Sequence, residues 1–180
     1  NSNKTEASIG KFGVGFKAVF QYTATPHIYD PEFRFRIDRF IVPTPIDEDF
    51  PSRKRDETLF VFPFDHTERD EEESYRDISD KLKNLSFPLL FLSQLKEIEF
   101  EIGNSIGMYG KSVKNTLIYD DTTAEYICLT QNDGDELYDE NLWLFSRVDD
   151  CQRRYSIGFF MDSNGHLKAV NEPAFCFFPT

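Results

Sequence analysis

Three glycines close together near the start of the chain, followed at once by an apolar segment, constrain its local structure more than any other feature. The run reads IGKFGVGFKAVF and spans residues 9–20. Glycine adopts positive φ angles without a Cβ clash and lets a ligand approach the backbone closely. The first turn of a helix adds unpaired N–H groups and the positive end of the helix dipole. The run therefore predicts a loop whose amides bind an anion, and phosphate is the expected anion.

The glycine spacing within residues 10–15 is GxxGxG. It differs from the GxGxxG of Rossmann dinucleotide sites and from the GxxxxGK[ST] of P-loops, so neither motif explains the run. The run resembles the second glycine box of the GHKL ATPases (gyrase B, heat-shock chaperone, histidine kinase and MutL types), and within them the heat-shock chaperones and sacsin-like proteins above all. The resemblance implies that the main-chain amides of residues 13–16 bind the ATP phosphates beneath a lid. A glycine-rich turn before an ordinary core helix is the alternative.

The resemblance extends from Ile9 to about Ile102. It implies an α+β fold, a mixed or antiparallel sheet with helices on one face, which is the C-terminal part of a Bergerat-type ATP-binding fold, followed by a β-rich segment. In that family a threonine after the long loop lies in the adenine pocket. Thr58 stands where it is expected, although Glu57 replaces the usual glycine; a β-branched residue that only fills a strand is the alternative. The cofactor-binding residues that the resemblance implies are Gly10, Lys11, Phe12, Gly13, Val14, Gly15, Phe16 and Thr58.

Three further residues of the family's site, one catalytic and two that bind metal or adenine, have no counterpart in this sequence. The family uses a Glu to activate water, an Asn to hold magnesium and an Asp to bind adenine, and all three precede the lid. Asn3 and Glu6 lie too close to the glycine run to belong to the missing helix. The resemblance implies ATP and Mg²⁺ as cofactors, with no catalytic residue and no metal ligand in this chain. Hydrolysis is expected only with a further N-terminal part, so enzyme activity stays an open question.

The two ends of the chain suggest a segment of a longer protein. Its first residue is Asn rather than Met, and its last residues directly follow an apolar run. A length of 180 residues fits one domain together with the start of another. We expect residues 1–110 to form the C-terminal portion of a GHKL-type ATP-binding domain. Residues 111–180 are expected to form a β-rich continuation, the start of the following domain.

Charge and cysteine content bound the partners and the compartment. The formal net charge of −12 argues against nucleic acid and anionic membranes, because lysine and arginine hold both of these partners. The expected partners are ATP and either a protein client or a second copy of the chain. Cys128, Cys151 and Cys176 are odd in number and lack CxxC spacing, which favours a reducing compartment. Because the sequence shows no signal peptide and no long apolar run, we expect a cytoplasmic protein.

Apolar periodicity predicts helices at residues 16–22 and 74–84, the second with a capping box that starts at Ser74. Residues 43–55 show no period and predict a loop. The strand at residues 58–62 is apolar on both faces, which predicts a central position, and most of the 19 phenylalanines are expected in the core. Strands are predicted at residues 27–30, 33–38, 58–62, 96–102, 116–119, 124–130, 142–148, 155–161 and 166–170.

Other motifs carry weaker signals. Gly110-Lys111-Ser112 has the end of a P-loop motif, but a strand follows it, so residues 103–112 are interpreted as a flexible connection between strands. His27, His66 and His166 lack the spacing of metal ligands. Two other functions remain open beside a sacsin-like, chaperone-type ATP-binding protein. One is a non-catalytic β-rich protein-interaction module, and the other is a histidine-kinase-like ATP-binding domain, for which the sequence shows no phosphoacceptor-histidine helix.

Overall fold

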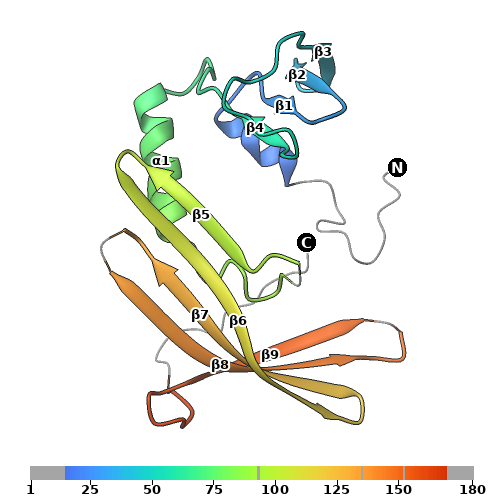
Figure 1. Cartoon of the computed structure of the whole chain (residues 1–180), viewed down its shortest axis with the longest axis vertical. Coiled ribbons are helices and arrows are strands. Elements are labelled where there is room, and N and C mark those ends of the chain that lie inside the picture. The colour runs from blue at the N-terminus through green and yellow to red at the C-terminus, as the bar shows by residue number, and fades with distance from the viewer. Residues whose placement is uncertain (1–14, 93, 135, 152, 170–180) are drawn as a thin grey trace. The chain divides into compact units, whose positions relative to one another are not determined.

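The computed structural model describes residues 15–169 except residues 93, 135 and 152 (Figure 1). The chain divides after Lys81 into two compact units, which we call the first and the second unit. The described part of the first unit begins with a 3-10 helix, η1, and a four-stranded antiparallel sheet, and the helix α1 follows. The elements are η1 (Phe16–Gln21), β1 (His27–Tyr29), β2 (Arg34–Asp38), β3 (Val42–Pro45), β4 (Leu59–Val61) and α1 (Glu71–Lys83).

The strands of the first unit lie in the order β3-β2-β1-β4. The central position predicted for the strand at residues 58–62 is therefore wrong, because among the described strands β4 lies at an edge and pairs only with β1. Part of the predicted loop at residues 43–55 forms β3, the other edge strand, although it contains Pro43 and Pro45. Proline is tolerated at such an edge because its missing N–H is not needed by a further strand.

The helix α1 begins earlier than its sequence pattern predicts. Asp70 is the capping residue, since its Oδ1 accepts a hydrogen bond from the Glu73 backbone N–H at 3.0 Å. Three glutamates, residues 71–73, occupy the first turn, where the helix dipole favours negative charge. Ser74, predicted to start the helix, instead lies buried within it and donates to the Asp70 carbonyl at 2.9 Å.

Asp77 on α1 is the centre of a polar cluster that ties this helix to the end of η1. The Tyr22 hydroxyl donates to Asp77 Oδ2 at 2.7 Å, and Lys81 and Arg69 donate to the same oxygen at 3.0 and 2.7 Å. The Arg69 guanidinium also lies over the Tyr22 ring, 4.6 Å from its centroid. The Tyr22 hydroxyl, together with Lys81 and Arg69, lowers the pKa of Asp77 from 3.8 to about 2.

The second unit contains a five-stranded antiparallel sheet in which each strand pairs with its neighbours in the sequence (Figure 1). Gly103 and Asp120 have positive φ angles in the short turns that follow β5 and β6. The long strand β6 has a bulge between Val113 and Asn115, where its register with β7 shifts. The strands are β5 (Glu97–Ile102), β6 (Ser105–Tyr119), β7 (Thr122–Asn132), β8 (Leu137–Val148) and β9 (Arg154–Met161).

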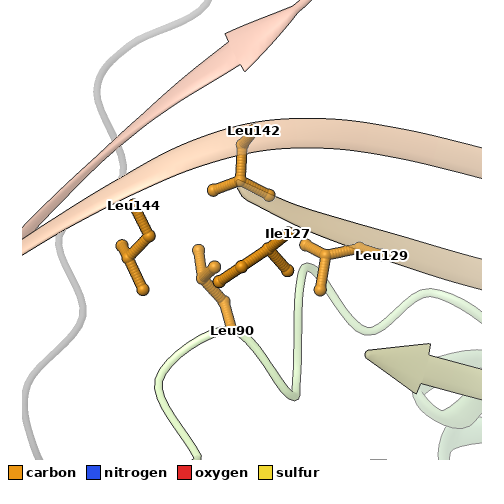
Figure 2. Close-up of a cluster of buried hydrophobic side chains, with 5 residues drawn as sticks. All are labelled: Leu90, Ile127, Leu129, Leu142 and Leu144. Atoms are coloured by element: carbon orange, nitrogen blue, oxygen red, sulfur yellow. The ribbon is translucent and has the colours of Figure 1, made fainter. Parts of the chain in front are cut away.

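One face of this sheet, which we call the inner face, carries the core of the second unit. Figure 2 shows Leu90 pointing toward four side chains of β7 and β8. Two of these, Ile127 and Leu142, are fully buried, and a buried side chain of this size is worth about 1.5–3 kcal/mol. The cluster consists of Leu90, Ile127, Leu129, Leu142 and Leu144. A second cluster on the same unit contains Leu89, Phe100 and Tyr109, with Leu82 and Leu85 packed against it.

Polar groups of β6 hold the segment that joins α1 to β5. Lys111 Nζ donates to the carbonyl oxygens of Leu89, Leu90 and Leu92 at 3.1, 3.1 and 2.7 Å. The Tyr109 hydroxyl donates to the Leu82 carbonyl at 2.6 Å and accepts from the Leu85 N–H at 3.1 Å. Burial lowers the pKa of Lys111, and its three carbonyl partners compensate for the water that the ammonium loses.

The expected α+β fold, with helices on one face of a sheet, is wrong. The described residues form two antiparallel sheets, and α1 is their only α-helix. Residues 103–112, predicted as a flexible connection, are also different from the prediction, because Ser105–Ser112 are the first half of β6. The boundary expected at residue 110 falls inside this strand. A Bergerat-type sheet covered by helices is thus not what the described part of the chain forms.

The expectation that most phenylalanines are buried is also wrong for the described part of the chain. Phe100 is the one phenylalanine there that is fully in the core, at 9% exposure. Phe33, Phe40 and Phe60 are 50, 65 and 48% exposed. Many aromatic rings instead contact each other at the surface of the sheets, as Phe60 and Phe62 do at 6.3 Å between centroids.

We expect Gly107→Ala to destabilise the second unit. A Cβ at Gly107 would lie 2.1 to 2.7 Å from atoms of the Phe100 ring, which is fixed in the core. Overpacking of this kind lowers the free energy of unfolding by about 1–3 kcal/mol, and unfolding of the variant in urea measures that loss. Gly110→Ala is the matched control, because a Cβ there meets its nearest atoms at 3.6 and 3.9 Å. Equal stability of the two variants would contradict the packing shown here.

We expect the contribution of Asp77 to stability to depend on pH. Because its pKa is lower in the folded protein, at about 2, the stability that it contributes is fully present above its ordinary value of 3.8. That contribution is lost as the pH falls through 2. Asp77→Asn should therefore lower the free energy of unfolding at neutral pH, by an amount that shrinks between pH 4 and 2. A difference that stays constant down to pH 2, or that exposed Asp56→Asn reproduces, would contradict this assignment.

Candidate functional site

The structure describes three of the eight residues that the sequence assigns to a nucleotide site. Gly15, Phe16 and Thr58 lie within the described part of the first unit, and Gly10, Lys11, Phe12, Gly13 and Val14 lie outside it. The described portion of the site is therefore the end of the glycine run and the element that follows it. Its geometry is considered first.

Gly15 immediately precedes η1 and has φ −57° and ψ −47°. Its carbonyl accepts the first turn hydrogen bond from the Ala18 N–H at 3.2 Å. Among the residues that the structure describes, none beyond its chain neighbours has a heavy atom within 4 Å of the position that a Cβ would take at Gly15. The predicted helix at residues 16–22 is confirmed as a short 3-10 helix. The described part of the first unit therefore leaves the backbone at Gly15 open to a ligand.

Phe16 anchors the end of the glycine run to the sheet of the first unit. Its ring centroid lies 6.2 Å from that of Phe20 on the same helix and 6.2 and 6.3 Å from those of Phe60 and Phe62. These distances are typical of favourable contacts between aromatic rings. The side chain of Phe16 therefore has a structural role, and only its main chain remains for the role predicted from sequence.

Thr58 lies just before β4 and is exposed. Its hydroxyl donates to Asp30 Oδ2 at 2.7 Å, next to the end of β1. A threonine oxygen that donates one hydrogen bond keeps lone pairs with which it can accept another. Thr58 is thus no buried β-branched filler of a strand, and its oxygen can still accept a hydrogen bond from a ligand amino group.

The loop before Thr58 is organised by Arg53, a residue that the sequence pattern did not single out. Its side chain is 6% exposed, and its Nε donates to Asp49 Oδ1 at 2.8 Å. Its Nη1 donates to the carbonyls of Lys54 and Glu57 at 2.9 and 2.8 Å. Arg53 lowers the pKa of Asp49 to about 2. The position of Glu57, and with it the start of β4, is therefore fixed by this arginine.

A cavity of about 660 Å³ opens beside the hairpin of β2 and β3 in the first unit. Arg39 and Phe40 form the tip of this hairpin with φ angles of 51° and 68°, which side chains of their size rarely adopt. The Phe40 ring is 4.9 Å from that of Phe20, so the cavity is adjacent to η1. No turn signal of the glycine or asparagine kind marks this hairpin in the sequence. The lining residues are Ala24, Thr25, Asp38, Arg39, Phe40, Val42, His66 and Thr67.

Asp65 fixes the backbone at residues 23–25, which borders this cavity. Its Oδ1 accepts hydrogen bonds from the Thr23 hydroxyl and the Ala24 N–H at 3.0 and 2.6 Å, and its Oδ2 accepts one from the Thr25 hydroxyl. Although partial burial raises the pKa of Asp65, the hydrogen bonds from Thr25 and its neighbours outweigh it, so the pKa is lowered. The carboxylate is satisfied by these partners and holds the turn rather than offering itself to a ligand.

Among residues 15–169, apart from the three that are not described, no group of three or more histidine, cysteine or acidic side chains could hold a metal ion. His27 contacts Tyr29, and His166 lies 3.7 Å from Asp162. No described helix is long and apolar enough to cross a membrane. Lys111, part of the P-loop-like tripeptide, is committed to the three carbonyls described above, so that tripeptide is not a phosphate site.

Comparison of the chain with protein-family models, with curated proteins and with solved structures found no match. The resemblance to GHKL proteins therefore stays a prediction from the sequence. Of the glycine run, the structure describes only its last residues, from Gly15 onward.

Proposed function

We propose that the glycine run binds the phosphates of ATP and that the protein acts as an ATP-binding, chaperone-type protein similar to the sacsin-like GHKL proteins. The observation that carries the proposal is the GxxGxG run leading into η1, together with a Gly15 backbone that the described residues leave uncovered. Consecutive main-chain amides at such a glycine-rich bend can converge on an anion, and glycine allows the close approach that this requires. The proposal concerns this segment and does not extend to a helix-covered sheet.

Binding, rather than hydrolysis, is the step that the residues of this chain support. Phosphoryl transfer needs a positioned water and neutralisation of charge, and the sequence has no counterpart of the family's catalytic Glu and magnesium-binding Asn. Mg²⁺ would arrive as the companion ion of ATP, but the described residues supply no ligand set for it. For the base, Thr58 offers one acceptor oxygen, held in place by Asp30.

The partners and the compartment belong to the same proposal. A net charge of −12 disfavours nucleic acid and anionic membranes, so ATP and a polypeptide are the proposed partners. Cys128 and Cys151 are free thiols, which suits the reducing cytoplasm. A second candidate function is that of a non-catalytic protein-interaction module. The apolar side chains exposed on the five-stranded sheet favour it, and they do not depend on any nucleotide.

We expect Gly15→Ala to weaken ATP binding while leaving the fold intact. The backbone angles of Gly15 are ordinary for alanine, and the added methyl group meets no atom of the described residues beyond its chain neighbours, so the free energy of unfolding should not fall. The methyl group would occupy the space through which the phosphates approach, and about a tenfold loss of affinity for MgATP is expected by calorimetric titration. The double variant Gly13→Val/Gly15→Val should abolish binding.

The control for these measurements is Gly110→Ala, which lies in the second unit and should leave ATP affinity unchanged. The titrations use the protein that contains this sequence, with circular dichroism to show that each variant is folded. Unchanged ATP affinity in the folded double variant would contradict the proposal. So would the absence of ATP binding by the unsubstituted protein.

A further inference from the structure

The face of the five-stranded sheet opposite the core, which we call the outer face, has an aromatic end and an acidic end. Successive strand residues point to opposite faces, so the residues between the core positions of β7 and β8 define the outer face. The aromatic end consists of Leu117, Tyr126, Trp143, Phe145, Ile157 and Phe159, and the acidic end consists of Glu97, Glu99, Glu101 and Asp139.

The strand register places the aromatic end in two adjacent rows. Tyr126, Trp143 and Phe159 are direct neighbours on β7, β8 and β9, and the Tyr126 and Trp143 ring centroids are 5.2 Å apart. In the next row, Phe145 lies opposite Ile157, and its ring is 6.0 Å from that of Phe159. Phe145, Phe159 and Ile157 are 38, 45 and 61% exposed. A continuous exposed apolar patch of this kind is typical of a binding surface.

The acidic end begins on the edge strand β5. Glu97, Glu99 and Glu101 alternate along this strand and are all exposed on the same face, about 7 Å apart from one to the next. None of the three has a lysine or arginine nitrogen within 4.0 Å among the described residues. The register carries the Glu97 row across Gly110 and Thr130 to Asp139, which is also exposed.

The two ends are close enough for one bound segment to reach both. Asp139 and Trp143 are four residues apart on β8, which corresponds to about 13 Å along the strand. A helix of a few turns, or a strand of a few residues, spans that distance. A partner that places cationic side chains over the carboxylates would therefore also reach the aromatic rings with its apolar side chains.

We propose that the outer face docks a segment of another protein that carries lysine or arginine at one end and apolar side chains at the other. Charge complementarity selects this occupant, because no described lysine or arginine pairs with the three glutamates of the acidic end, which would therefore attract a cation. A second copy of the chain fits less well, since each copy carries a net charge of −12 and association would bring like charges together. This inference deepens the second candidate function and does not depend on ATP binding.

The experiment uses the sole tryptophan of the chain, Trp143, as a reporter inside the surface itself. A synthetic amphipathic helix of leucine and lysine, about four turns long and free of tryptophan, is titrated into the protein. Saturable binding with a shift of the Trp143 emission is expected. The same peptide with glutamate in place of lysine should bind at least about tenfold more weakly.

Two variants test the two ends of the surface, each with a matched control in the first unit. Ile157→Ser at the aromatic end and the double variant Glu97→Lys/Glu99→Lys at the acidic end should each lower peptide affinity about tenfold. The two variants and their two controls all change exposed side chains, so the unfolding midpoint of each should stay close to that of the unsubstituted protein. The controls, which should not lower affinity, are Ile41→Ser, at a residue 82% exposed, and the double variant Asp47→Lys/Glu48→Lys, at two exposed residues, which changes the net charge as much as the acidic-end variant does.

Three results would overturn the inference. One is equal affinity for the lysine and glutamate peptides. Another is a loss of affinity in Asp47→Lys/Glu48→Lys equal to that in the acidic-end variant, which would show attraction to net charge alone. The third is a dimer of the unsubstituted protein that Ile157→Ser converts to a monomer, since the occupant would then be a second copy. ATP titration of the same variants separates this inference from the nucleotide proposal, because neither change lies in the first unit.

Discussion

The second unit depends on how the segment between α1 and β5 is held against the inner face of its sheet. Leu90 enters the apolar cluster on β7 and β8, while Lys111 binds the carbonyls on either side of it. The apolar contact drives burial, and the ammonium satisfies backbone groups that burial would otherwise leave without partners. Because both interactions act on the same few residues, this short segment is held firmly against the inner face.

The first unit uses a different device, a network of charges around a small number of apolar contacts. Asp77 joins α1 to Tyr22, Asp65 fixes the turn after η1, and Arg53 organises the loop before β4. Each of these side chains bonds to backbone or to side chains distant in sequence. Such contacts define a conformation more than they supply free energy, because exposed ion pairs contribute little on their own. The candidate nucleotide site is therefore built on elements whose positions are set by polar contacts.

The sequence predicted best those elements whose two faces differ in polarity. β5 was recognised from glutamates that alternate with Ile98 and Phe100, because an edge strand with one wet face shows its period plainly. The strands at residues 124–130, 142–148 and 155–161 are confirmed within β7, β8 and β9. The first half of β6 was missed because Gly107 and Gly110 read as a loop, whereas Gly107 is needed beneath the Phe100 ring. Of the candidate site, the structure describes only the neighbourhood of Gly15 and Thr58. The spacing of the glycines predicts a bend there, but it does not show which backbone amides face a ligand.

The bulge in β6 shifts by one residue the alternation of its side chains between the two faces of the sheet. Before it, Tyr109 and Lys111 lie on the covered side, and after it, Leu117 lies on the open side, although all three have odd numbers. Because of the extra residue, odd-numbered residues lie on the covered face before the bulge and on the open face after it. Evolution can therefore exchange which side chains of the distal half of β6 are presented to solvent by gaining or losing one residue near Lys114, with no change in composition elsewhere.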